Sequence, residues 1–481
     1  MIREIVRQPE TANSRMFMSA KKNADLELNG YLEEEYFFSG TANVYGKDSV
    51  SRWKVVAAEA PYTNRFLVRR PRNLRQASGR VVVEIINSSS YMDIDRSWVL
   101  LHEQLIRNGD TYVGITSKPI TMKTLRKFDP QRYALLSWSN PRRCHLPKEA
   151  LGNFANASNP ETEDGLFWDM LVELGLACRG ENEFLGGLAV KKVYLVGWSQ
   201  SGSYLVTYTN WFARDRFEKG LPPVYDGIFS MAPGPAVVPA LNQEESTVIS
   251  AGDATVQFSC VPYYTLHTES ENAGLGTHAT RISDSDDLQL QYRIKEIAGA
   301  THDCVYSMED YYKDRSDQLK TSIFLNYPGC EPTPNNFPYQ LAYHAALMQL
   351  YAWVENGLLP PTNAPITVRE DLTNKTDKNG NAEGGWRLPE IELPVCTYQR
   401  MATPLCAGMS TMLYGCELPF TPATLHRLYG SAGHYADLVR AAAQKAVEGR
   451  WLMAEDVEYC VRHAVAKAVH YGLEQEECSN D

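Results

Sequence analysis

The sequence predicts an α/β fold with a mostly parallel central sheet. Three observations predict it: short apolar runs alternate with segments of helical periodicity, several of these runs are rich in β-branched residues, and turn residues separate the segments. Strands that alternate with helices form units in which the strands lie parallel. The chain has 481 residues, which is long enough for a large core that needs neither disulfides nor metal to fold.

Short apolar runs predict the strands. The first two lie in a β-rich N-terminal part and are separated by Pro61, which cannot donate a ladder hydrogen bond. The run 80–86 is nearly all β-branched, as expected of a strand that is buried on both faces. In chain order, the predicted strands are 55–58, 65–68, 80–86, 111–116, 192–196, 227–231, 263–266 and 292–297.

Apolar side chains at helical spacing predict the helices. Two of them end at an Asn-Gly pair, at 108–109 and at 356–357, and glycine is a common helix stop. The predicted helices are 98–106, 165–178, 203–214, 339–355 and several within a helical tail that runs from 424 to 472. Between them, the segment 377–381 resembles a calcium loop but lacks the glutamate at the far end of such a loop, so we expect a plain turn.

The charge and the composition exclude several functions. Lys and Arg number 47 against 58 Asp and Glu, a net charge of −11 that argues against binding to nucleic acid or to an anionic membrane. The N-terminus lacks the apolar run of a signal peptide, and no stretch is long and apolar enough for a transmembrane helix. None of the 10 cysteines forms a CxxC pair, so we expect buried free thiols and no metal. A cytoplasmic protein is expected.

The sharpest motif is GWSQSG at 197–202, which directly follows the strand 192–196 and begins a helix. A serine on so tight a turn has strained backbone angles, so the residues two before and two after it must be small. Gly197 and Ser201 meet this requirement, although a serine stands where a second glycine is usual. The motif therefore predicts a nucleophile elbow with Ser199 as the nucleophile; the alternative is an ordinary strand–turn–helix with small residues.

A serine nucleophile needs a base, and the base needs a carboxylate that orients it. His302 fits best, because it follows the strand 292–297 and comes later in the chain than the serine. His278 lies in a loop without a preceding strand, and His344 lies inside a predicted helix. The two histidines that precede the serine and are weaker candidates are His102 and His145.

Two glutamates are the candidate acids. Glu269 and Glu271 both follow the strand 263–266, and the alternative for both is a solvated loop carboxylate. The acidic cluster 284–287 reads as a solvated loop or helix start, because it lacks metal-ligand spacing.

An oxyanion hole completes such a site. One donor is expected to be the backbone N–H of Gln200, and the other comes from the loop after the strand 80–86, where Ser88 is preferred and Ser89 is next.

With these residues in place, the chain resembles a bacterial family known as alpha/beta hydrolase domain-containing proteins. The elbow is similar to the G-x-S-Q-S-G of that family. The family's acid loop is similar to T-E-T-D, which shifts the preference to Glu269, although ordinary loop spacing favours Glu271 and the choice stays open. The other matching segments are 83–87, 112–119, 129–134, 298–302, 384–389 and the tail from 428 through 452.

The resemblance implies an α/β-hydrolase fold with a Ser-acid-His triad. We expect a mostly parallel sheet of about eight strands in one enlarged catalytic domain. Its organisation is predicted as a β-rich part at 1–75, an α/β-hydrolase core at 76–358 with excursions at 232–260 and 303–338, and a largely helical extension at 359–481. The extension is expected to pack on the core or to cover the site.

Together these features predict a serine hydrolase that cleaves a small-molecule carboxylic ester without a cofactor. Trp198, beside the nucleophile, is a candidate substrate contact for an apolar or aromatic group, although core packing explains it equally well. The alternatives are an acyltransferase that uses the same acyl-enzyme, a non-catalytic binding or scaffold protein on the same fold, and a metal-dependent hydrolase. The oligomeric state is not predicted.

Overall fold

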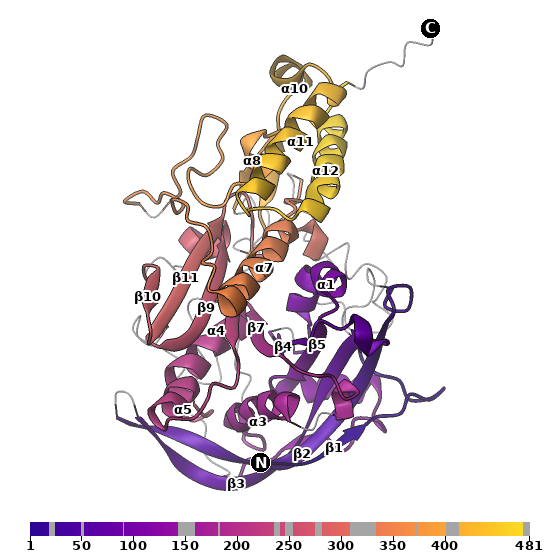
Figure 1. The fold of residues 1–481 in the computed structure, drawn as a ribbon, viewed down its shortest axis with the longest axis vertical. Coiled ribbons are helices and arrows are strands. Elements are labelled where there is room, and N and C mark those ends of the chain that lie inside the picture. The colour runs from indigo at the N-terminus through magenta and orange to yellow at the C-terminus, as the bar shows by residue number, and fades with distance from the viewer. Residues whose placement is uncertain are drawn as a thin grey trace. The chain divides into compact units, whose positions relative to one another are not determined.

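A computed structural model describes the chain in two compact units (Figure 1). The described parts of Met1–Thr265 and Ala279–Arg293 form unit 1, and those of Leu266–His278, Ile294–Asp310 and Asn326–Asp481 form unit 2. The structure describes residues 1–18, 25–49, 52–89, 91–142, 159–180, 183–234, 241–245, 254–274, 281–307, 333–371, 373–400 and 413–474. The predicted three-part organisation is defined by chain order and remains a prediction.

A large mixed sheet dominates the fold, with eleven strands among the described residues. Along its path the order is β1-β2-β3-β5-β4-β7-β8-β9-β11-β10, and β6 pairs with β3 off this path. The strands are β1 (Ile2–Arg7), β2 (Tyr31–Ser49), β3 (Arg52–Pro71), β4 (Arg80–Ile86), β5 (Thr111–Thr116), β6 (Ser137–Trp138), β7 (Lys192–Trp198), β8 (Gly227–Met231), β9 (Ser259–Thr268), β10 (Ser285–Asp287) and β11 (Leu290–Ile297).

The centre of the sheet is parallel, as the sequence predicts. β5, β4, β7 and β8 pair in parallel, whereas β1, β2 and β3 form an antiparallel edge. In β4 and β7, every residue after the first is buried, which is why both strands are nearly continuous apolar runs. The α/β fold class with a mostly parallel sheet is therefore confirmed, and the antiparallel edge adds strands beyond the expected eight.

The antiparallel edge differs from its prediction. The runs 55–58 and 65–68 are parts of one long strand, β3, and Pro61 lies within it, opposite Thr41 of β2. On its other side, β3 pairs with β6 from Tyr62 onward and with β5 at 66–69. Pro61 precedes both of these ladders, so its missing N–H interrupts neither of them.

The helices follow the predicted periodicity closely. α1 (Arg96–Asn108) ends at Gly109, whose φ of 69° is left-handed, and α7 (Gln340–Asn356) ends in the same way at Gly357. The helix predicted at 203–214 is instead divided by a π-helical turn into two short helices. The others are α2 (Met122–Phe128), α3 (Phe167–Arg179), α4 (Gln200–Thr207), α5 (Arg214–Glu218), α8 (Pro389–Glu392), α10 (Pro422–Tyr429), α11 (Ala432–Glu448) and α12 (Val457–His470).

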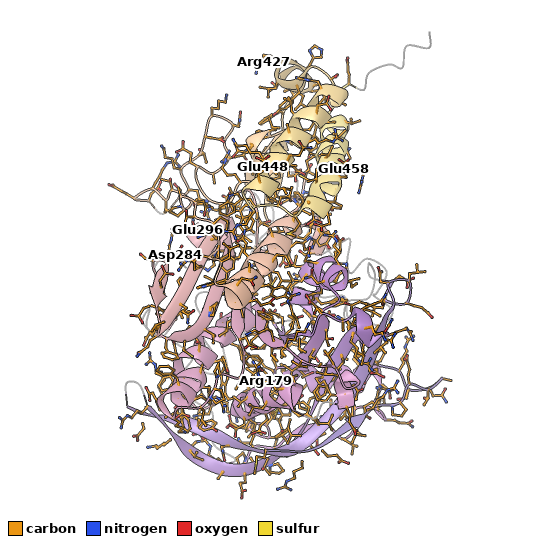
Figure 2. The ribbon with its side chains drawn as sticks, viewed as in Figure 1. Arg179, Asp284, Glu296, Arg427, Glu448 and Glu458 are labelled. Carbon is orange, nitrogen blue, oxygen red and sulfur yellow. The ribbon has the colours of Figure 1, made fainter. Side chains whose placement is uncertain are left out.

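Polar contacts at the ends of these elements fix the core of unit 1. Arg179, at the end of α3 and labelled in Figure 2, donates to the backbone oxygen of Val224 at 2.9 Å and to Asp226 at 2.6 Å. Asp226 in turn accepts from the Val193 N–H at 2.7 Å. The end of α3 is thereby tied to the beginning of β7, the strand that carries the GWSQSG motif.

A buried charged cluster holds the C-terminal helices of unit 2. The Lys467 ammonium on α12 donates to Glu390 of α8 at 3.0 Å and to Glu417 of β13 (Cys416–Pro419) at 2.9 Å. It also contacts Tyr398 of β12 (Cys396–Gln399), the strand that pairs with β13. α11 and α12 lie side by side (Figure 1). The predicted helical tail is present, and whether it covers a site stays a prediction.

Two smaller predictions can also be compared with the structure. The segment 377–381 is a turn, closed by a 2.7 Å hydrogen bond from the Asp377 N–H to the Asn381 oxygen. Six of the cysteines lie in the described chain, and all six are free thiols.

Within the described parts of the chain, every helix is too short or too polar to serve as a transmembrane span.

Candidate active site

Ser199 lies on a strained turn between β7 and α4, in unit 1. Its φ of 55° and ψ of −120° are unusual for a residue with a side chain. The turn is held by a hydrogen bond from the Ser199 N–H to the Met231 oxygen at 2.9 Å and by one from the Gly234 N–H to the Ser199 oxygen at 3.1 Å. This strand, strained residue and helix form the arrangement that an elbow motif predicts.

The small residues around Ser199 have steric reasons. A Cβ on Gly197 would lie 2.5 Å from the backbone oxygen of Ser201, which is too close for any side chain. A Cβ on Gly202 would lie 3.0 Å from Cα of Pro233. Ser201 itself is buried, and its hydroxyl has no hydrogen-bond partner among the described residues. The turn therefore needs glycine at 197 and accepts serine at 201.

The loop after β4 is bonded to this turn within unit 1. The Asn87 side chain donates to the Trp198 backbone oxygen at 3.0 Å, and the Ser88 hydroxyl donates to the Gln200 side-chain oxygen at 3.1 Å. The Ser89 N–H donates to the Asn87 side-chain oxygen at 2.8 Å, whereas the Ser88 N–H donates no hydrogen bond among the described residues. Of the two candidate second donors, Ser88 is thus the one whose amide is not already engaged.

Gln200 is the first residue of α4. The first N–H groups of a helix have no acceptor inside the helix and carry the positive end of its dipole. The Gln200 amide therefore lies at the positive end of the α4 dipole, and its role as an oxyanion donor stays a prediction.

Trp198 packs in the interior. Its side chain is only 1% exposed, and the Arg96 guanidinium lies 6.0 Å from its ring. This environment is that of a core residue, so contact between Trp198 and a substrate stays a prediction.

The predicted base and one of the candidate acids form a buried pair in unit 2. His302 follows β11, and its Nδ1 lies 2.5 Å from Oε1 of Glu271. The other carboxylate oxygen of Glu271 accepts from the N–H and the hydroxyl of Thr268, at 2.6 and 2.7 Å. Because Nδ1 faces a carboxylate, it carries the proton, and Nε2 is left as the basic nitrogen.

The preference for Glu269 as the partner of His302 is wrong. Its carboxylate instead accepts from the Gly299 N–H at 2.5 Å and from the Asn374 side chain at 2.8 Å. β9 ends at Thr268, and the π-helical turn Ser270–Gly274 then points Glu271, rather than Glu269, toward the histidine. Glu269 ties the acid loop to the histidine loop and to the C-terminal region of unit 2.

The pKa values of the two glutamates shift in opposite directions. Burial would raise the pKa of Glu271, but the His302 charge and the hydrogen bonds from His302 and Thr268 bring this pKa below its ordinary value. Burial raises the pKa of Glu269 above its ordinary value, and the donors Gly299 and Asn374 offset this only in part. Glu271 is therefore held as an anion, which is what an orienting carboxylate requires.

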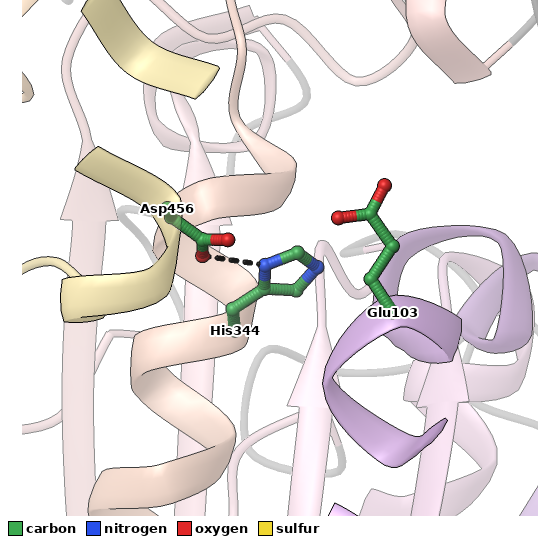
Figure 3. A group of neighbouring side chains, drawn as sticks. All are labelled: Glu103, His344 and Asp456. Carbon is green, nitrogen blue, oxygen red and sulfur yellow. Dashed lines mark hydrogen bonds and ion pairs between the residues drawn. The ribbon is translucent and has the colours of Figure 1, made fainter. Parts of the chain in front are cut away.

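His344 has a carboxylate partner of its own. It lies inside α7, fully buried, and its Nδ1 is 2.7 Å from Oδ2 of Asp456, which precedes α12 (Figure 3). Its Nε2 has no hydrogen-bond partner among the described residues. The carboxylate follows this histidine by 112 residues, the reverse of the order expected from the sequence.

The remaining candidates lie elsewhere or outside the described residues. His102 is buried in α1, and its Nδ1 lies 3.0 Å from the Val99 oxygen. Asp284 and the strand β10 form a hairpin edge with β11, where Arg293 lies 3.9 Å from Asp284 (labelled in Figure 2) and also pairs with Asp286. His145 and His278 lie outside the described residues.

Comparison with known proteins gives several solved structures at low similarity and one family model. Among solved structures, a putative dienelactone hydrolase from Klebsiella pneumoniae is 13% identical, with a TM-score of 0.31, 59% of this chain covered and 95% of that one. A thermostable esterase from Pseudomonas putida is 12% identical, with a TM-score of 0.31 and coverages of 63% and 82%. One of two fungal esterases from Rhizomucor miehei is 9% identical, with a TM-score of 0.29 and coverages of 58% and 77%. A search among curated proteins gave no match.

The fold is that of the α/β hydrolases, as the family model over nearly the whole chain shows. Residues 6–462 match the family model described as alpha/beta hydrolase domain, so the chain belongs to this family. The predicted family and fold are confirmed.

Proposed function

We propose that this protein is a serine hydrolase that cleaves a small-molecule carboxylic ester through an acyl-enzyme. The observation that carries the proposal is the backbone of Ser199, whose φ of 55° is strained for a serine and holds the residue between β7 and α4. Residues with strained backbone angles cluster at active sites. Membership of the alpha/beta hydrolase family supports the same reaction class.

The proposed mechanism uses His302 and Glu271 as base and orienting acid. Ser199 attacks the acyl carbon, and Nε2 of His302 accepts the serine proton and later gives it to the leaving alcohol. Glu271 keeps the Nδ1 proton in place and stabilises the imidazolium that forms. Water, activated by the same histidine, then attacks the acyl-enzyme and releases the acid, so serine and histidine return to their starting states.

The negative charge of the tetrahedral intermediate has two proposed donors. One is the Gln200 N–H at the beginning of α4, and the other is the Ser88 N–H. Support comes from the Ser88–Gln200 side-chain bond of 3.1 Å, because it holds both donor residues to the same turn. No cofactor or metal enters any of these steps.

Labelling with a fluorophosphonate probe tests the proposal. The wild type should bind the probe covalently, and Ser199→Ala should abolish labelling. Ser201→Ala is a matched control, because this buried hydroxyl lies two residues away and has no partner among the described residues. An unlabelled wild type, or equal labelling of Ser199→Ala, would remove the serine-hydrolase proposal. Product analysis with added alcohols would then separate hydrolysis from acyl transfer.

A further inference from the structure

Thr268 contacts Glu271 twice. It is the last residue of β9 and is fully buried, and its N–H and hydroxyl donate to Oε2 of Glu271 at 2.6 and 2.7 Å. The opposite oxygen, Oε1, faces Nδ1 of His302 at 2.5 Å. One residue therefore supplies two donors to one carboxylate oxygen, and the other oxygen faces the histidine.

The same threonine is linked to the histidine loop through Ser270. The Ser270 N–H donates to the Thr268 hydroxyl oxygen at 3.2 Å, and the His302 N–H donates to the Ser270 hydroxyl at 3.1 Å. The acid side chain and the histidine backbone are thus fixed by one short chain of hydrogen bonds. Because every member is at most 4% exposed, water competes little with these contacts.

Titratable groups from three elements act on Glu271. His302 faces it from the loop after β11, His267 from β9, and Tyr343 from α7. Both histidines favour the anion, and burial together with the charge of Glu271 raises the pKa of Tyr343, so this phenol stays neutral. Thr268 is a neutral group that donates directly to the anion.

We propose that Thr268 is a positioning residue that orients Glu271 toward His302 and sets how tightly the pair holds its proton. Its importance for catalysis rests on the proposed serine-hydrolase function. A donor on Oε2 offsets part of the carboxylate charge, so without it the pair attracts a proton more strongly. The expected consequence of losing the hydroxyl is a pair that titrates at higher pH.

Three variants test this inference. Thr268→Val removes the hydroxyl but keeps the shape and the backbone N–H, and Thr268→Ser restores a hydroxyl. Thr265→Val is the matched control on the same strand, because the Thr265 hydroxyl is buried and has no partner among the described residues. Each variant is titrated by NMR with histidine labelled at Cε1, and the His302 signal is assigned by its loss in His302→Asn.

The wild type and the variants should separate clearly. In Thr268→Val the His302 titration should move to higher pH by about half a unit, and kcat at the high-pH plateau should fall about tenfold with KM unchanged. Thr268→Ser should return both values to within about twofold of the wild type. Thr265→Val should match the wild type in both measurements.

The two readouts keep the inference distinct from the proposed function. If His302 titrates identically in the wild type and in Thr268→Val, the role of Thr268 is overturned, whatever the enzyme does. If the titration moves as expected but the wild type shows no Ser199-dependent labelling, the serine-hydrolase proposal fails while the control of the His302–Glu271 pair by Thr268 stands. A shift in Thr265→Val as large as that in Thr268→Val would also overturn it.

Discussion

Among the histidine–carboxylate pairs in the described part of unit 2, two have both partners buried and are similar in local chemistry. Nδ1 of His302 lies 2.5 Å from Glu271, and Nδ1 of His344 lies 2.7 Å from Asp456. Both carboxylates are buried, and the chain positions differ: the first pair joins two loops that follow β9 and β11, whereas the second joins the interior of α7 to the beginning of α12. The comparison teaches that a carboxylate on Nδ1 does not by itself identify a catalytic base.

The difference in position suggests different roles. Loops at strand ends can present a side chain to a substrate, because the strands fix them while their tips stay accessible. A histidine in the middle of a packed helix has neighbours on all sides, and its carboxylate then joins two helices. Under the proposed function, catalysis therefore belongs to His302, and His344 attaches one helix to another.

The largest expected effect comes from removing the basic nitrogen of His302, and the same change at His344 is the comparison. Asparagine can keep the donor that faces the carboxylate but lacks Nε2, so His302→Asn should lower kcat by about a thousandfold or more. His344→Asn should keep kcat within about threefold, because its Nε2 takes no part in the reaction. Ester hydrolysis by the two purified variants measures this, and a larger loss in His344→Asn would reverse the assignment.

The acids give the next contrast. Glu271→Gln presents an amide to the histidine and should lower kcat by about three orders of magnitude, through the wrong tautomer. Asp456→Asn should leave fluorophosphonate labelling unchanged and lower the free energy of unfolding by about 1–3 kcal/mol, because a hydrogen bond to a charged group is weakened. Urea denaturation and labelling of both variants are the measurements. Loss of labelling in Asp456→Asn alone would contradict the comparison.

Glu269→Gln should have an intermediate effect. The new amide would oppose either the Gly299 N–H or the Asn374 side chain, so the free energy of unfolding should fall by about 1–3 kcal/mol. The kcat should fall about tenfold at most, because Glu269 does not bond to the histidine. A loss of kcat as large as that of Glu271→Gln would return Glu269 to the role of the acid.

The smallest expected effect is a difference in pH dependence between these two glutamates. The pKa of Glu271 is lowered from 4.5, so its contribution to stability is present above that value and is lost as pH falls through its lower folded pKa. The pKa of Glu269 is raised from 4.5, so its contribution is full below that value and declines as pH rises through its higher folded pKa. The free energy of unfolding of each Gln variant is subtracted from that of the wild type at each pH. This difference should rise with pH for Glu271→Gln and fall with pH for Glu269→Gln. Two slopes of the same sign would contradict the opposite directions of these two pKa shifts.

Much of the fold follows from local sequence. Strands β4, β7 and β8 are mostly apolar runs because both of their faces are buried, and this pattern is visible without any knowledge of neighbours. Ser199 was likewise predictable, because the small residues around it serve contacts within a few positions, such as that between Gly197 and Ser201. His302 followed from its position after a strand and after the serine in chain order.

By itself, then, the sequence determined the α/β class, the central strands, the strained turn at Ser199 and the choice of His302 among the histidines. Only the tertiary structure decided that Pro61 lies inside β3, that Glu271 rather than Glu269 meets His302, and that His344 pairs with Asp456. The physical reason is the range of the interactions. Periodicity and turn sterics act over a few residues, whereas a strand partner or a carboxylate direction depends on segments that are distant in the chain.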